Sequence, residues 1–207
     1  MQLTIDRVEL TNFRQFYGTQ IIPLAPAPGR PLTVIEGPSA SGKSTIAGAI
    51  LDVLCPEANV QPWHCRLNML EEDGPAAVRV HATAGRAARV PPWLARVFLD
   101  DTARLRLLDD PSPATSHLDA AALRALPGLV EEMEARLGLG EDRDALGPRT
   151  LASLALAWAI SRVCGHGLPF VFDEPLACLD LAARAAVAEH ILGTGAHQVI
   201  EIGRAHV

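Results

Sequence analysis

The sequence predicts an α/β fold with a mainly parallel sheet, an antiparallel β subdomain and a short helical lobe. Two observations predict it. Short apolar runs rich in β-branched residues alternate with segments of helical periodicity, and one such run leads through a glycine-rich loop directly into a helix. With 207 residues, of which 49% are apolar and 20% charged, the chain can bury one sizeable core. We therefore expect a single domain over residues 1–207.

The order of the expected elements divides this domain into two parts. A first lobe is expected over about 1–75 and 165–207, and a β and helical insert over about 76–164. The expected strands are about 2–10, 19–24 and 32–36, a β-rich segment with arginines over 77–100, an acidic strand near 170–172, and 198–202. The expected helices begin at Lys43 and cover about 117–137, 149–163 and 181–192.

The stretch GPSASGKST, residues 37–45, contains the only lysine of a chain with 18 lysines and arginines in all. It fits the phosphate-binding pattern G-x-x-x-x-G-K-[ST], and its place between a strand and a helix favours this interpretation over an ordinary Gly/Ser turn. The compact ammonium of Lys43 reaches the β- and γ-phosphates where a planar guanidinium does not fit, and Ser44 places its hydroxyl on Mg²⁺. The chain is thus predicted to be a P-loop NTPase. The predicted nucleotide-binding residues of this loop are Gly37, Ser39, Ala40, Gly42, Lys43, Ser44 and Thr45.

A second nucleotide signal is LPFVFDEPLACLD, residues 168–180. Its apolar run delivers Asp173 and Glu174 to the carboxyl end of a buried strand, where open α/β sheets bind their ligands. Asp173 is predicted to hold Mg²⁺ through water, and Glu174 to activate the water that attacks the γ-phosphate. The alternative is that the two carboxylates cap the following turn. Asp180 lies where a further carboxylate reaches a dimer interface, and we count it among the nucleotide-binding residues.

The charge distribution restricts contact with nucleic acid to a local site. The net charge is −6, whereas residues 79–106 contain six arginines against two aspartates. This stretch is a candidate for DNA contact, and a solvated face on a hairpin explains it equally well.

The sequence shows no pattern that indicates a membrane segment or an oxidising compartment. No apolar run approaches the length of about 20 residues that spans a bilayer, and no signal peptide is recognised, so a cytoplasmic location is expected. The four cysteines show neither disulfide nor metal-ligand spacing and are expected to be reduced thiols. They are Cys55, Cys65, Cys164 and Cys178.

Four stretches resemble the heads of SMC/RecF-type ABC ATPases, and most closely those of the DNA sulfur-modification ATPase family DndD. They are TNFRQFYGTQIIPL at 11–24, VPPWLARVFLDD at 90–101, LASLALAWAI with LPFVFDEPLACLD at 151–180, and HQVIEI at 197–202. The resemblance implies an ABC-type ATPase head that uses ATP and Mg²⁺ and acts on DNA in modification, repair or phage defence. It also implies a homodimer or a partner protein, and a place beside the nucleotide for Arg14, for which a surface salt bridge is the alternative.

The sequence departs from that family in two places. The long coiled coil is reduced to residues 117–138, where Pro127 and Gly128 are expected to break the heptad pattern and leave at most a short helical hairpin. The signature loop falls on DALGPRTL, where Ala145 and Leu146 replace the serine and the first glycine. By resemblance, Gly147 then remains to bind the nucleotide of the opposite subunit.

Three functions remain open on the sequence alone. The first is an SMC-like ATPase, supported by Glu174 beside an intact phosphate loop. The second is a regulatory subunit that binds nucleotide with little turnover, supported by the altered signature. The third is the ATPase subunit of an ABC transporter.

Overall fold

The computed structural model contains two three-stranded sheets. It describes residues 3–27, 30–54, 77–84, 97–140, 145–165, 167, 169–173, 178–193 and 198–203. The antiparallel sheet has the order β2-β1-β4, from strands β1 (Leu3–Phe13), β2 (Phe16–Pro23) and β4 (Ala77–Ala84). The parallel sheet has the order β3-β6-β5, from strands β3 (Leu32–Ile35), β6 (Val199–Ile202) and β5 (Phe170–Asp173). The predicted combination of a parallel sheet and an antiparallel subdomain is confirmed.

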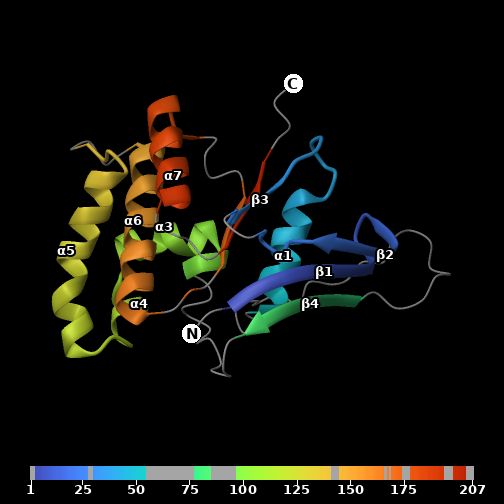
Figure 1. Ribbon diagram of the computed structural model, residues 1–207, viewed down its shortest axis with the longest axis horizontal. Helices are drawn as coiled ribbons and strands as arrows, with labels where there is room; N and C mark the ends of the chain where they lie inside the picture. The colour runs from blue at the N-terminus through green and yellow to red at the C-terminus, as the bar shows by residue number, and fades with distance from the viewer. Residues whose placement is uncertain are drawn as a thin grey trace.

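The helices lie on both sides of the parallel sheet. They are α1 (Lys43–Leu54), α3 (Asp101–Asp109), α4 (Ser112–Thr115), α5 (Ala120–Arg136), α6 (Leu146–Cys164) and α7 (Leu181–Gly193). Figure 1 shows α1 and the antiparallel sheet on one side of the parallel sheet, and the lobe that contains α5, α6 and α7 on the other. Parallel sheets are covered on both faces in this way because their strands are apolar on both faces.

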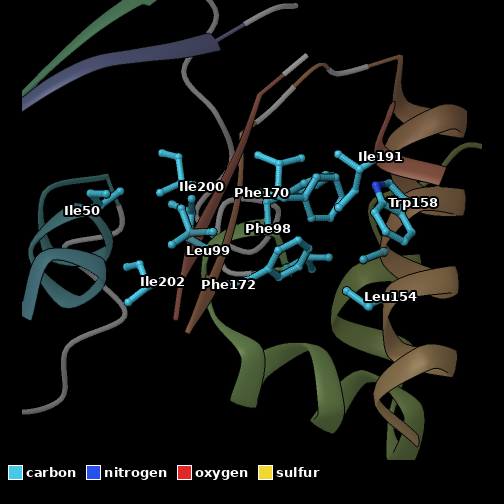
Figure 2. Packing of buried hydrophobic residues seen from close by; sticks show 14 of the residues in the cluster. Ile50, Phe98, Leu99, Leu154, Trp158, Phe170, Phe172, Ile191, Ile200 and Ile202 are labelled. Carbon is cyan, nitrogen blue, oxygen red and sulfur yellow. The ribbon is translucent and has the colours of Figure 1, made fainter. Parts of the chain in front are cut away.

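The core continues through the parallel sheet. Ile200 and Ile202 face Ile50 of α1, whereas Phe170 and Phe172 point to the opposite face, toward the side chains of the helical lobe (Figure 2). On that face the ring of Phe170 lies 4.6 Å from that of Phe98 and 5.3 Å from that of Trp158, measured between centroids. The alternation along each strand explains why these strands are apolar throughout.

Helix α6 is buried around its whole circumference. All residues from Thr150 to Ile160 are buried, because α6 packs against α5 and α3 and also against the parallel sheet. An apolar segment such as LASLALAWAI is therefore a core helix. Among the residues that the structure describes, no helix combines the length and apolar character needed to cross a membrane.

Helix α5 corrects the expectation of a break at Pro127. The helix runs through Pro127 without interruption, with Leu126 and Met133 buried against the core. Asp119 caps its start by accepting hydrogen bonds from the amides of Ala121 and Ala122 at 2.9 and 2.8 Å. A proline inside a helix costs about 3 kcal/mol, and burial of each large apolar side chain returns about 1.5–3 kcal/mol. Packing on α6 therefore outweighs the local effect of the proline.

The β-rich segment expected over 77–100 is also only partly correct. The strand ends at Ala84, residues 97–99 are helical, and the unpredicted helix α3 follows; residues 85–96 lie outside the described part. Asp100 starts α3, because its Oδ1 accepts hydrogen bonds from the amides of Thr102 and Ala103.

The predicted division into two lobes stays a prediction. Strand β4, at the start of the expected insert, pairs with β1 of the first lobe from Leu3↔Ala84 to Thr11↔Ala77.

Candidate nucleotide-binding site

The loop between β3 and α1 contains residues with positive φ, a backbone conformation that glycine adopts without strain. Gly42 adopts φ +101°, and a Cβ placed there would lie 2.7 Å from the ring of Phe16 and collide with the side chain of Gln15. Ala40 also has a positive φ, of 64°. The turn between β1 and β2 therefore packs directly on the loop, and glycine at position 42 makes that close approach feasible.

Lys43 lies at the first position of α1 and is only 8% exposed. Its Nζ donates hydrogen bonds to the carbonyl oxygens of Gly37 and Pro38, at 2.9 and 2.8 Å. These contacts hold the ammonium against the loop at the N-terminal end of the helix. Positive charge is thereby concentrated at the place where backbone amides and the helix dipole favour an anion.

Ser44 and Asp173 meet at the carboxyl end of the parallel sheet although they are 129 positions apart in the sequence. The Oγ of Ser44 donates a hydrogen bond of 3.0 Å to Oδ1 of Asp173, and both residues are exposed. A hydroxyl and a carboxylate are hard oxygen ligands of the kind that Mg²⁺ prefers. The strand β5 thus delivers its carboxylate beside the loop, as the sequence predicts.

A cavity of about 370 Å³ lies over this loop. The described residues that line it are Gln15, Ser39, Ala40, Gly42, Lys43, Ser44, Thr45 and Asp173. All of these except Gln15 are predicted from the sequence. The missed Gln15 exchanges hydrogen bonds of 3.2 and 3.3 Å with the hydroxyl of Thr45. Its position in the NFRQF turn, beside the predicted Arg14, was the available signal.

Several predicted residues that the structure describes do not line the cavity. Arg14 adopts φ +51°, and its guanidinium lies 5.8 Å from the ring of Phe13. Asp180 caps α7, because its Oδ1 accepts a hydrogen bond of 2.8 Å from the amide of Ala183. None of Arg14, Gly37, Gly147 and Asp180 is among the described residues that line the cavity, although the carbonyl oxygen of Gly37 accepts a hydrogen bond from Lys43. Glu174 lies outside the described residues, so its role as general base stays a prediction.

The altered signature coincides with the start of α6. Ala145 is the N-cap residue and makes no side-chain capping hydrogen bond, while Leu146 is 59% exposed. Gly147 follows in the first turn, where a Cβ would lie 2.9 Å from the carbonyl oxygen of Cys178. Glycine at position 147 is therefore required for the close approach of α6 to residue 178.

The arginine-rich stretch 79–106 is not a uniform surface. Arg79 and Arg106 are exposed, whereas Arg104 is 1% exposed and points into the core, which removes it from any DNA-contacting face. Arg86, Arg89 and Arg96 lie outside the described residues.

An ion-pair cluster occupies the outer face of the antiparallel sheet. Glu9 lies 3.0 Å from Nε2 of His81, 3.2 Å from Nε of Arg7 and 3.9 Å from Arg79. Hydrogen bonds from His81 and Arg7 lower the pKa of the Glu9 carboxyl below its usual value. The cluster carries two arginines and a histidine around one carboxylate, and a second carboxylate, that of Asp6, accepts a hydrogen bond from Thr83 on the same face. The two arginines are therefore balanced by two carboxylates.

Two comparisons of the sequence each find a similarity over part of the chain. Residues 5–62 match the model of the P-loop-containing region of AAA domains. Over 47 residues, which are 23% of this chain, the sequence is 45% identical to the chromosome partition protein Smc of Synechocystis sp.. The chain matches only 4% of the length of that protein.

Comparison of structures extends the similarity to the whole chain. An Smc head solved in complex with the C-terminal winged-helix domain of ScpA aligns over 97% of this chain and 89% of its own, with a TM-score of 0.59 and 18% identity. The SMC head domain from Thermotoga maritima aligns over 100% of this chain and 90% of its own, with a TM-score of 0.56 and 16% identity. The chain has the fold of these head domains.

Proposed function

We propose that this chain, which has the SMC head fold, binds ATP with Mg²⁺ and hydrolyses it. One observation carries the proposal: Ser44 of the phosphate loop and Asp173 of β5 are 3.0 Å apart at the edge of the cavity that Lys43 lines. A P-loop NTPase needs a cation for the phosphates and two oxygen ligands for the metal within one site. The described residues supply these three groups together.

The residues present fit a magnesium nucleotide. The loop amides and Lys43 would bind the phosphates, Ser44 and Asp173 would hold Mg²⁺, and Gln15 would lie beside the nucleotide through its contact with Thr45. When bound, Mg²⁺ supplies charge neutralisation at the phosphate oxygens. Glu174, which follows Asp173 directly in the sequence, is proposed to accept the proton of the attacking water.

A regulatory subunit with little turnover is the second candidate, and the start of α6 favours it. In related ATPases the signature loop binds the nucleotide held by the opposite subunit. Here Ala145 offers no hydroxyl and Leu146 exposes an apolar side chain at that place. The nucleotide would then be bound but hydrolysed slowly.

We also propose a role in DNA modification, repair or phage defence, as in the DndD family. The exposed guanidinium groups of Arg7 and Arg79 on the antiparallel sheet are the candidates for phosphate contact. Two solved Smc heads, one of them from Pyrococcus furiosus, were bound to ScpA domains, and we propose that this chain likewise works with a second copy or a partner protein.

The binding step is tested with Lys43→Ala. The variant loses the cation of the phosphate site, and ATP affinity should fall by about a hundredfold or more in a calorimetric titration. Lys43→Arg is the matched variant, because it keeps the charge but not the compact shape, and it should bind almost as poorly. Wild-type affinity in both variants would refute the assignment.

The hydrolytic step is tested with Glu174→Gln, which keeps the shape of the side chain but cannot accept the proton. Turnover should fall by about 10² to 10⁴-fold while ATP binding persists. Glu131→Gln, on the exposed side of α5, is the control and should hydrolyse at the wild-type rate. Turnover at background in the wild type, with and without DNA, would favour the regulatory function. Equal turnover in wild type and Glu174→Gln would assign the base elsewhere.

A further inference from the structure

Arg104 of α3 places its guanidinium inside the core, against the outer edge of β5. Its Nη1 donates hydrogen bonds to the carbonyl oxygens of Val97 and Phe98, at 3.1 and 2.9 Å, and its Nη2 donates to that of Val171 at 3.0 Å. The guanidinium carbon also lies 4.9 Å from the centre of the Phe172 ring. One buried side chain therefore connects α3, the helical residues 97–99 and the strand β5.

The contact with Val171 completes the hydrogen bonding of a strand edge. In the described part of the sheet, β5 pairs with β6 on one side only. The amide of Phe170 bonds to the carbonyl of Gln198 on that side, and because backbone groups alternate along a strand, the carbonyl of Val171 points to the other edge. A buried carbonyl needs a donor, and here the donor is an arginine rather than a further strand.

The strand β5, whose edge Arg104 contacts, ends at the nucleotide site. Asp173 is the last residue of β5, two residues after Val171, and it accepts the hydrogen bond of Ser44. Because β5 has only four residues, the hydrogen bonds along each of its two edges contribute much of the restraint on the position of Asp173 at its end. A shift of about 1 Å in a metal-binding carboxylate is enough to impair a site.

Keeping a guanidinium in this position has an energetic cost. Burial lowers the pKa of Arg104 to about 9, and the nearby Asp100 carboxylate only partly offsets this effect. At neutral pH the side chain is still protonated, so its donors remain available. An apolar side chain of similar length would avoid the cost but would leave the three carbonyls without these bonds.

We infer that Arg104 is a positioning residue of the nucleotide site, which holds the edge of β5 and thereby sets the Asp173 carboxylate opposite Ser44. This inference rests on the proposed function, and it assigns the role to a residue outside the cavity. Arg104 acts on the metal-binding half of the site, whereas Lys43 and the loop amides belong to the phosphate-binding half.

The test compares ATP affinity with Mg²⁺ and with a chelator, in wild type and in Arg104→Met. The variant should lose about tenfold in affinity with Mg²⁺ and should retain wild-type affinity in the chelator, because the phosphate loop is unaffected. Arg106→Met, an exposed arginine on the same helix, is the matched control and should behave as wild type in both conditions. Equal losses in both conditions, or no loss in a folded variant, would overturn the inference.

Hydrogen exchange of the ligand-free protein separates this inference from the proposed function. The amides of residues 170–173 should exchange up to about tenfold faster in Arg104→Met, while those of α5 and α1 keep their rates. If the wild type binds no ATP, the proposed function fails. Unchanged exchange of the β5 amides in Arg104→Met would overturn the positioning role, whether or not the wild type binds ATP.

Arg104→Lys serves where Arg104→Met does not fold. Lysine keeps the cation but not the planar fork that reaches three carbonyls, so the Mg²⁺-dependent part of the affinity and the exchange of β5 should both lie between wild type and complete loss. Wild-type values of both quantities in the lysine variant would overturn the inference.

Discussion

At the scale of single residues, His190 of α7 makes the stability of the fold depend on pH. The residue is 7% exposed, and its ring lies 4.3 Å from that of Trp158 in the helical lobe. Burial lowers the pKa of His190 below 6.5, and the positive charges of Arg136 and Arg162 lower it further. The neutral ring is therefore the form that the folded protein favours.

The sign of the effect follows from proton binding. Below pH 6.5 the unfolded chain protonates His190 and the folded protein resists until the lower folded pKa is reached, so the free energy of unfolding falls as the pH drops through this window. In His190→Phe, which keeps an aromatic ring beside Trp158, the fall between pH 7.5 and 5.5 should be smaller than in wild type. Urea unfolding at several pH values measures it. Parallel pH profiles for the two proteins would contradict the assignment.

The residues that the sequence could reveal are those whose role is local. The glycines, Lys43 and Ser44 belong to one short pattern, and Asp173 ends a recognisable strand. Gln15 and Arg104 were not predicted in their roles, because their partners Thr45 and Val171 are 30 and 67 residues away. Arg104 also counted toward a basic surface stretch, since a one-dimensional charge pattern carries no information on burial.

At the scale of elements, α5 shows how packing overrides local preference. Glu132 forms ion pairs of 2.7 Å with Arg136 of the same helix and 3.1 Å with Arg162 of α6, next to the buried contacts of Met133. Exposed ion pairs contribute little, so the apolar face carries most of the stabilisation. The apolar spacing of this segment correctly predicted a helix, whereas the proline rule, which is local, wrongly predicted its interruption. The sequence did not predict helix α3, because its arginines interrupt the apolar spacing from which an amphipathic helix is recognised.

Gly128 in the middle of α5 is expected to weaken the helix. A Cβ at this position would meet no atom within 4 Å, so Gly128→Ala should raise the free energy of unfolding by about 0.5–1 kcal/mol. The midpoint of urea unfolding should increase accordingly, with the slope of the transition unchanged.

Gly138, just after the same helix, supplies the matched control. A Cβ there would also meet no atom within 4 Å, but the residue has φ +68°, which L-amino acids adopt at a cost of about 1–2 kcal/mol. Gly138→Ala should therefore destabilise the protein although the same methyl group is added in equally open space. Stabilisation by both substitutions would show that backbone conformation does not decide the sign.

At the scale of the whole molecule, one buried glutamine joins the two sheets. Gln198, immediately before β6, is fully buried, and its Oε1 accepts a hydrogen bond of 2.8 Å from the amide of Ile5. Its Nε2 donates to the carbonyl oxygens of Ile5 and Leu24, both at 2.8 Å. The antiparallel sheet, whose turn packs on the phosphate loop, is thereby fixed to the parallel sheet that carries Asp173. No sequence pattern indicates this joint, because it links residues 174 and 193 positions apart.

Replacing this side chain should disrupt the joint without a large change of volume. Gln198→Leu removes the side-chain partner of the amide and carbonyl of Ile5 and of the carbonyl of Leu24, which keeps a hydrogen bond of 3.4 Å from the hydroxyl of Thr33. Each unsatisfied group costs about 1–3 kcal/mol, so the two groups of Ile5 should leave a loss of about 2–4 kcal/mol in the free energy of unfolding. Gln20→Leu makes the same chemical change at an exposed site, where Nε2 donates to the carbonyl oxygen of Tyr17, and should cost less than about 0.5 kcal/mol. Denaturant unfolding distinguishes the two. If both variants lost equally little, the sheets would be held together by their apolar contacts alone, and the position of the β1–β2 turn over the nucleotide cavity would not depend on Gln198.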